Sequence, residues 1–140
     1  MANVYGEIDA TPITLKRVSD GDTIVTSDDT RIRLWGIDTP EIDQRYGSHA
    51  TAALTEMLYE QQLYLETKDV DRFGRTVGVI YTAGGDEVNL EMVCNGHAWW
   101  YERYAEKAIE YKQCQEDAHR NKRGLWAEED PLAPWDWRRL

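Results

Sequence analysis

Residues 31–41 (RIRLWGIDTPE) constrain the fold most, because they describe a β-strand that has to stop at a defined point. Apolar residues alternate with two arginines, so the strand carries Arg33 on one of its faces. Pro40 fixes its own φ and favours an extended conformation for the residue before it, so the chain has to turn soon after Asp38. The segment therefore predicts an arginine, an aspartate and Glu41 close together where a strand ends.

A plain turn is the simpler interpretation of this segment. In it, Asp38 would cap a helix, Glu41 would lie in the first helical turn, and Arg33 would face solvent. Short motifs often match by chance, so the remainder of the chain has to decide between the two interpretations.

The length and composition indicate one compact domain. The 140 residues are 41% hydrophobic and 11% aromatic, which suits a single core. We expect one domain over residues 1–140, with its core at about 13–127 and an irregular tail at 128–140 packed on the body. Cys94 and Cys114 are too few for a disulfide framework, and whether they pair is left open.

The first residues lack the basic and apolar regions of a signal peptide, and no run is long enough to cross a membrane. We therefore expect either a cytoplasmic protein or a secreted or periplasmic one whose leader has been removed, without membrane contact and as a monomer. The formal net charge of -10 argues against a nucleic-acid partner, because phosphate backbones attract Lys and Arg. A nucleic-acid function would need a local positive site or a metal ion.

Alternating and three-to-four residue periodicities predict the elements of the fold. Strands are expected near residues 14–18 and at 23–26, from 31 onward, at 63–66 and at 76–82. Helices are expected at 48–61 with Ser48 as N-cap, at 89–94 with Asn89 as cap, and over residues 104–118. This order predicts an α+β, mainly β fold, namely a five-stranded Greek-key OB-fold barrel covered by about three helices.

Acidic residues occur in the turns of the expected three-strand meander. Asp20, Gly21 and Asp22 form the first turn, in which we expect the glycine to adopt a backbone conformation that other residues resist. In an antiparallel meander this turn lies at the same end as the end of the third strand, so Asp22 and Asp38 are expected to converge. Oxygen ligands without His or Cys suit Ca²⁺ better than Zn²⁺. Two acidic turns that merely repel each other in solvent are the alternative.

Phosphate chemistry is indicated by the other charged residues. Glu41 is the best placed candidate for a base, and Arg33 and Arg75 can offer forked donors to a phosphate. The histidines at 49, 97 and 119 are scattered and lack the spacing of a zinc site.

Five motifs together resemble the staphylococcal (micrococcal) nuclease family, also called the thermonuclease or SNase-like family. They are DGDT at 20–23, RLWGIDTPE at 33–41, DRFGR at 71–75, GHAW at 96–99 and RGLW at 123–126, in the order of the family and over nearly the whole domain. The resemblance implies an OB-fold and a Ca²⁺-dependent endonuclease, a phosphodiesterase that acts on DNA and RNA and leaves 3′-phosphate ends.

The resemblance also implies roles for single residues. It implies that Asp22, Asp38 and the backbone carbonyl of Thr39 bind the metal ion, with Asp20 just outside these ligands. It also implies that Glu41 is the general base and that Arg33 and Arg75 bind the scissile phosphate. Substrate binding is assigned to Arg72, Phe73, Tyr101 and Tyr104, with single strands preferred because their bases are open to stacking. Phe73 departs from the tyrosine of the best-known member, and the acidic composition departs from that basic relative.

Two rival functions remain. A non-catalytic nucleic-acid- or protein-binding module shares this fold, but the complete set of charged residues favours an enzyme. A structural calcium-binding protein would leave Arg33, Glu41 and Arg75 without a function.

Overall fold

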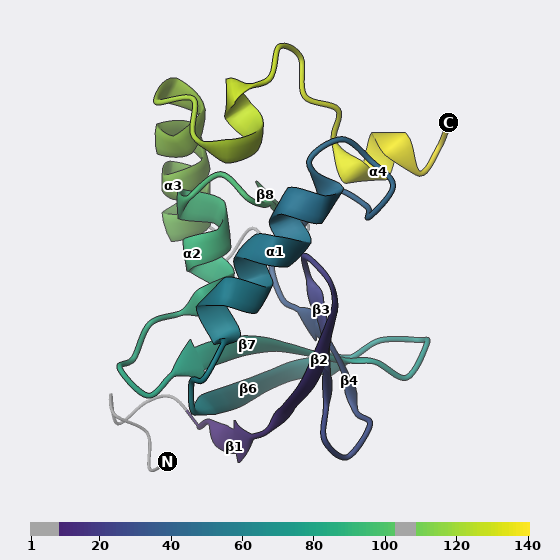
Figure 1. The fold of residues 1–140 in the computed structure, drawn as a ribbon, viewed down its shortest axis with the longest axis vertical. Helices are drawn as coiled ribbons and strands as arrows, with labels where there is room; N and C mark the ends of the chain where they lie inside the picture. The colour runs from purple at the N-terminus through teal and green to yellow at the C-terminus, as the bar shows by residue number, and fades with distance from the viewer. Residues whose placement is uncertain (1–8, 103–108) are drawn as a thin grey trace.

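The computed structural model describes residues 9–102 and 109–140 (Figure 1). The strands are β1 (Thr11–Ile13), β2 (Leu15–Asp20), β3 (Thr23–Thr26), β4 (Arg31–Leu34), β5 (Ile37–Asp38), β6 (Leu63–Val70), β7 (Thr76–Thr82) and β8 (Trp99–Trp100). The helices are α1 (Gly47–Leu58), α2 (Val88–Cys94), α3 (Ile109–Arg120), the 3₁₀ helix η2 (Gly124–Ala127) and α4 (Pro134–Trp137). None of the described helices is long and apolar enough to span a bilayer.

The main sheet has the strand order β1-β6-β7-β4-β3-β2, and β5 and β8 form a separate pair. β1 and β2 are consecutive stretches of one segment, interrupted at Thr14, yet β1 pairs with β6 and β2 pairs with β3. This segment thus borders both edges of the sheet and curls it towards a barrel. β4 and β7 are parallel, and the other pairs are antiparallel. The predicted α+β OB-fold class is confirmed, with the first of the five expected strands divided in two.

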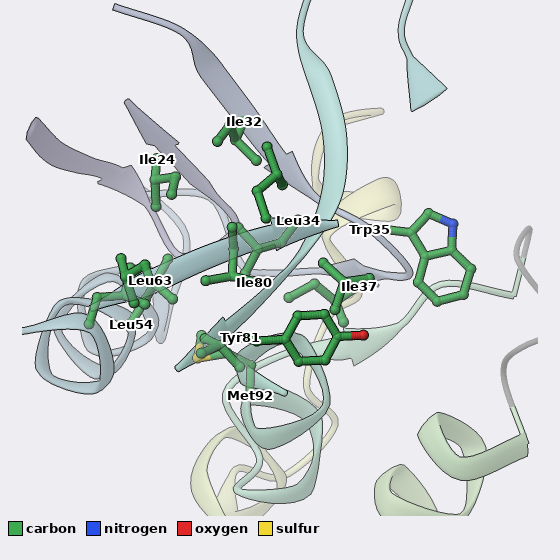
Figure 2. Close-up of a cluster of buried hydrophobic side chains, with 14 of the residues drawn as sticks. Ile24, Ile32, Leu34, Trp35, Ile37, Leu54, Leu63, Ile80, Tyr81 and Met92 are labelled. Carbon is green, nitrogen blue, oxygen red and sulfur yellow. The ribbon is translucent and has the colours of Figure 1, made fainter. Parts of the chain in front are cut away.

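The core lies between the curled sheet and the helices that cover it (Figures 1 and 2). Ile24 and Ile32 face each other across β3 and β4 and are fully buried. Burial alternates along β4, as in a strand with one apolar face, whereas all four residues of β3 are buried. α1 contributes Ala50, Leu54 and Leu58, which recur every four residues and form one buried stripe. The core therefore fixes the strands whose ends carry the acidic turns.

Several element boundaries differ from the sequence-based expectation. α1 begins at Gly47 after Tyr46, whose backbone is left-handed at φ 73°, so Ser48 is not its N-cap. β6 continues to Val70, well past the expected end at residue 66. The tail that we expected to be irregular contains α4. Residues 104–108 of the expected long helix lie outside the described residues.

Cys94 at the end of α2 and Cys114 in α3 form a disulfide, which resolves the pairing that the sequence left open. The bond joins two helices that also pack against each other in the half of the molecule opposite β1 and β6 (Figure 1). It therefore ties together the helical cover of the sheet.

Asn89 does not cap α2, because α2 begins one residue earlier and has Glu87 at its N-cap. The fully buried Asn89 side chain instead bonds three backbone groups of the sheet. Its Oδ1 accepts from Ile80 N (3.0 Å), and its Nδ2 donates to the carbonyls of Trp35 (2.9 Å) and Gly78 (3.1 Å). This amide therefore holds α2 against β7 and the end of β4.

We expect Asn89→Ala to lower the free energy of unfolding by about 2–4 kcal/mol, because it leaves buried backbone groups without partners. Urea denaturation followed by circular dichroism measures this change. Asn95→Ala is the matched control: Asn95 is exposed and bonds only within its own helix end, to Glu91. Similar losses for the two variants would contradict the structural role of Asn89.

Candidate nucleic-acid-cleavage site

A pocket of about 810 Å³ lies where the β2–β3 turn, the end of β4, β5, the β6–β7 hairpin and the C-terminal tail meet. Ten charged side chains are among the residues that line it. They are the acids Asp20, Asp22, Asp38, Glu41, Asp69 and Asp71 and the arginines Arg33, Arg72, Arg75 and Arg138. With six acids against four arginines, this lining is formally negative.

The guanidinium of Arg33 lies between the carboxylates of Asp22 and Asp38. Nη1 is 3.5 Å from Asp22 Oδ2, and Nη2 is 3.6 Å from Asp38 Oδ1. The meander produces this arrangement: Arg33 pairs with Thr23 across β3 and β4, and Leu34 N donates to the carbonyl of Asp22 (2.8 Å). The two carboxylates thus converge at one end of the sheet, as the order of the turns predicts.

Thr39 and Gly21 bring the two acidic turns into close contact. Thr39 N donates to Asp22 Oδ2 (3.1 Å), and Thr23 Oγ1 donates to Asp22 Oδ1 (3.1 Å). A Cβ at Gly21 would lie only 2.7 Å from Thr39 Oγ1. Gly21 is not among the residues with positive φ, so our conformational explanation of this glycine was wrong. The glycine is required because the turns approach so closely.

The surroundings shift the pKa values of three neighbouring acids in different directions. Burial disfavours the charge of Asp22, but Arg33 and the hydrogen bonds from Thr39 and Thr23 outweigh it and lower the pKa of Asp22. Burial, together with the charge of Asp22, raises the pKa of Asp20 to about 7. Burial also raises the pKa of Asp38, against the hydrogen bonds from Arg138. Of these three acids, Asp22 is therefore the one whose negative charge the surroundings favour.

The β6–β7 turn is ordered by Asp71. Its Oδ1 accepts from the backbone N of Phe73 and of Arg75, both at 2.9 Å, and its Oδ2 accepts from Arg75 Nε at 2.7 Å. Gly74 allows the turn with φ 80°. Phe73 is 71% exposed, and the guanidinium carbons of Arg72 and Arg75 lie 5.0 and 5.8 Å from its ring centre. The turn thus presents an aromatic ring beside two arginines at the mouth of the pocket.

The pocket contains a residue that we did not predict, Arg138 from the tail. Its Nη1 and Nη2 donate to Oδ1 (3.3 Å) and Oδ2 (2.6 Å) of Asp38, and Nη1 also donates to Glu41 Oε1 (2.5 Å). These hydrogen bonds raise the pKa of Arg138 further above its usual range. The tail packs on the body, as expected, through Trp135, whose ring centre lies 5.4 Å from that of Trp99 and 5.9 Å from that of Tyr101.

Gln44 is a second residue that sequence reasoning missed. Its Oε1 accepts from Glu41 N (3.1 Å), and its Nε2 donates to the carbonyl of Leu132 (2.7 Å). The side chain is buried although it belongs to a loop. Gln44 therefore fixes both the loop that carries Glu41 and the start of the tail.

The structure brings almost all predicted site residues to this pocket. Those that line it are Asp20, Asp22, Arg33, Asp38, Thr39, Glu41, Arg72, Phe73, Arg75 and Tyr101. The exception is Tyr104, which lies outside the described residues. Their common location is what a joint function requires; the role of each residue stays a prediction.

The profile of the staphylococcal nuclease homologue family matches residues 31–128, which include most of this pocket. The chain belongs to this family. It is 37% identical over 135 residues to the micrococcal nuclease of Shigella flexneri, covering 88% of this chain and 78% of that protein. It is 38% identical over 127 residues to an uncharacterized endonuclease of Haemophilus influenzae, covering 88% and 70% of the two chains.

A plant relative shows that the domain also occurs within larger proteins. A probable staphylococcal-like nuclease of Oryza sativa subsp. japonica is 38% identical over 124 residues, which cover 89% of this chain and 33% of the plant protein. The staphylococcal nuclease-like domain described here is therefore similar to about a third of that relative.

The carboxylates of Asp22 and Asp38 are suitable ligands for a hard cation, although in the structure both form ion pairs with arginines. Within residues 9–102 and 109–140, no group of three or more His, Cys, Asp or Glu side chains is arranged to hold a metal ion. Asp22 and Asp38 nevertheless converge on one cationic group, the guanidinium of Arg33. Two converging carboxylates are oxygen ligands of the kind that Ca²⁺ takes, so these residues fit the ion chemically.

Proposed function

We propose that this chain is a Ca²⁺-dependent endonuclease that hydrolyses phosphodiester bonds of DNA and RNA. The observation that carries the proposal is the shared pocket, which Glu41, Arg33 and Arg75 line together with Asp22 and Asp38. Relatives named micrococcal nuclease and endonuclease over most of this chain support the same activity.

In the proposed reaction, Glu41 accepts a proton from a water molecule that attacks phosphorus. Arg33 and Arg75 donate hydrogen bonds to the phosphoryl oxygens, whose negative charge grows in the transition state. The bond to the 5′ oxygen breaks, so the products carry 3′-phosphate ends. Asp22, Asp38 and the carbonyl of Thr39 would hold Ca²⁺, with Asp20 supporting Asp22 through its hydrogen bond to Asp22 N (3.1 Å). When bound, the ion supplies positive charge next to the phosphate.

Calcium binding should depend on Asp22. We expect Asp22→Ala to abolish calcium binding in isothermal titration calorimetry, because it removes one of two carboxylate ligands. Asp22→Asn keeps the shape of this buried side chain and should weaken binding as well. Asp86→Ala removes the same charge from an exposed turn away from the pocket and is the control. Unchanged calcium affinity in both Asp22 variants would refute this ligand assignment.

Glu41→Gln should lower kcat by about 10²–10⁴-fold, because glutamine keeps the size of the side chain but cannot take the proton. Binding of a non-hydrolysable oligonucleotide should change little. Asp43→Asn, two residues away and exposed, controls for the lost charge. Wild-type turnover of Glu41→Gln in the presence of calcium would refute Glu41 as the general base. No turnover by the wild type under the same conditions would favour a non-catalytic binding module instead.

We further propose that single strands are preferred and that Phe73 stacks on an exposed base, together with Tyr101 and Tyr104. Phe73→Ala should reduce kcat/KM on single-stranded DNA by roughly 5- to 100-fold, since stacking contributes about 1–3 kcal/mol per base. Tyr59→Ala removes an aromatic ring of similar exposure (68%) outside the pocket lining and should have no effect. Equal cleavage of matched single and double strands at one ionic strength would contradict the preference.

A further inference from the structure

We infer that residues 131–140, here called the C-terminal strap, inhibit the site through Arg138, which competes with calcium for Asp38 and with water for Glu41. This inference rests on the proposed function. Arg138 and Asp38 lie 100 positions apart in the sequence. By contacting Asp38 and Glu41, Arg138 occupies two of the carboxylates to which we assign a function.

The strap is held in place at three points. Near its start, the carbonyl of Leu132 accepts the hydrogen bond from the buried Gln44. In α4, Trp135 packs on Trp99 and Tyr101, of which Tyr101 also lines the pocket. At its end, Arg138 reaches Asp38 and Glu41. The guanidinium is therefore positioned by packing and is not merely a mobile surface charge.

α4 sets the direction of Arg138. The helix begins at Pro134, whose fixed φ suits a first helical position, and Arg138 N donates to the carbonyl of Pro134 (3.0 Å). Residues three apart in a helix lie on the same side, so Arg138 follows Trp135 towards the body of the domain. Anchoring of the tryptophan thus brings the arginine to the pocket.

Arg138 uses the atoms that the proposed reaction needs. Both oxygens of Asp38, a side chain only 1% exposed, accept hydrogen bonds from this one guanidinium. A calcium ion bound by Asp38 would need the same oxygen lone pairs and would bring a second positive charge beside Arg138. Glu41 Oε1 accepts the third hydrogen bond, at the carboxylate that has to take a proton from water. Catalysis therefore requires that Arg138 leaves.

The contact can be broken. The Arg138 side chain is 44% exposed, so water can solvate its guanidinium once it separates from the buried Asp38, and Arg33 remains 3.6 Å from that carboxylate. The helix that ends just before Arg138 has only four residues. Calcium is thus expected to displace Arg138 from Asp38 and to loosen the strap, at the cost of part of its own affinity.

Calorimetric titration of calcium into the substrate-free chain tests the inference. Arg138→Gln removes the competing charge, so we expect it to bind calcium about tenfold more tightly than the wild type. Arg138→Lys keeps the charge but loses the forked contact, and it should lie in between. Arg139→Gln is the matched control, because this neighbouring arginine is exposed and is not among the residues lining the pocket.

Amide hydrogen exchange gives a second readout that does not depend on activity. Calcium should accelerate exchange in residues 131–140 of the wild type and should change little there in Arg138→Gln. Arg138→Gln with wild-type or weaker calcium affinity, or protection of the strap by calcium, would overturn the inference. If cleavage stayed calcium-dependent in that case, the proposed nuclease function would survive. If neither the wild type nor any variant bound calcium or cleaved DNA, both proposals would fall.

Discussion

The convergence of Asp22 and Asp38 on Arg33 is the interaction on which the site depends. Two carboxylates are brought together at the buried end of a β-sheet, where their mutual repulsion and desolvation are unfavourable unless a cation lies between them. The barrel supplies the placement: the β3–β4 register fixes Arg33 beside the turn that carries Asp22. In the structure guanidinium groups neutralise the pair, and in the proposed enzyme calcium would take over part of this role.

Local sequence patterns predicted the part of the site that strands and turns build. β-branched residues between two turns identified β3, alternation identified β7, and the order of an antiparallel meander placed Asp22 near Asp38. The DRFGR motif at residues 71–75 likewise marked the segment that turns at Gly74. In these cases the residues that determine the geometry are close in sequence, or are related by simple rules of strand pairing.

Tertiary packing determines the roles of the residues that sequence patterns explained wrongly or missed. Asn89 was expected to cap a helix, but its side chain bonds the backbone of the sheet. Position 21 requires glycine because Thr39 leaves no room for a Cβ. The partners of Gln44 and Arg138 lie 88 and 100 residues away in the sequence. A polar loop residue and a terminal arginine carry no periodic signal, so only the docking of the tail reveals their functions.

With calcium bound as proposed, the charge balance of the pocket would explain how a chain of net charge -10 acts on a polyanion. Three of the pocket arginines are paired with pocket acids: Arg33 with Asp22 and Asp38, Arg75 with Asp71, and Arg138 with Asp38 and Glu41. While these pairs persist, the pocket offers little net attraction for a phosphate. A divalent cation bound by Asp22 and Asp38 would offset the formal excess of two acids and make guanidinium groups available. Attraction for nucleic acid would then come from the metal-loaded pocket and from base stacking, and would not require the basic surface on which nucleic-acid-binding proteins commonly rely.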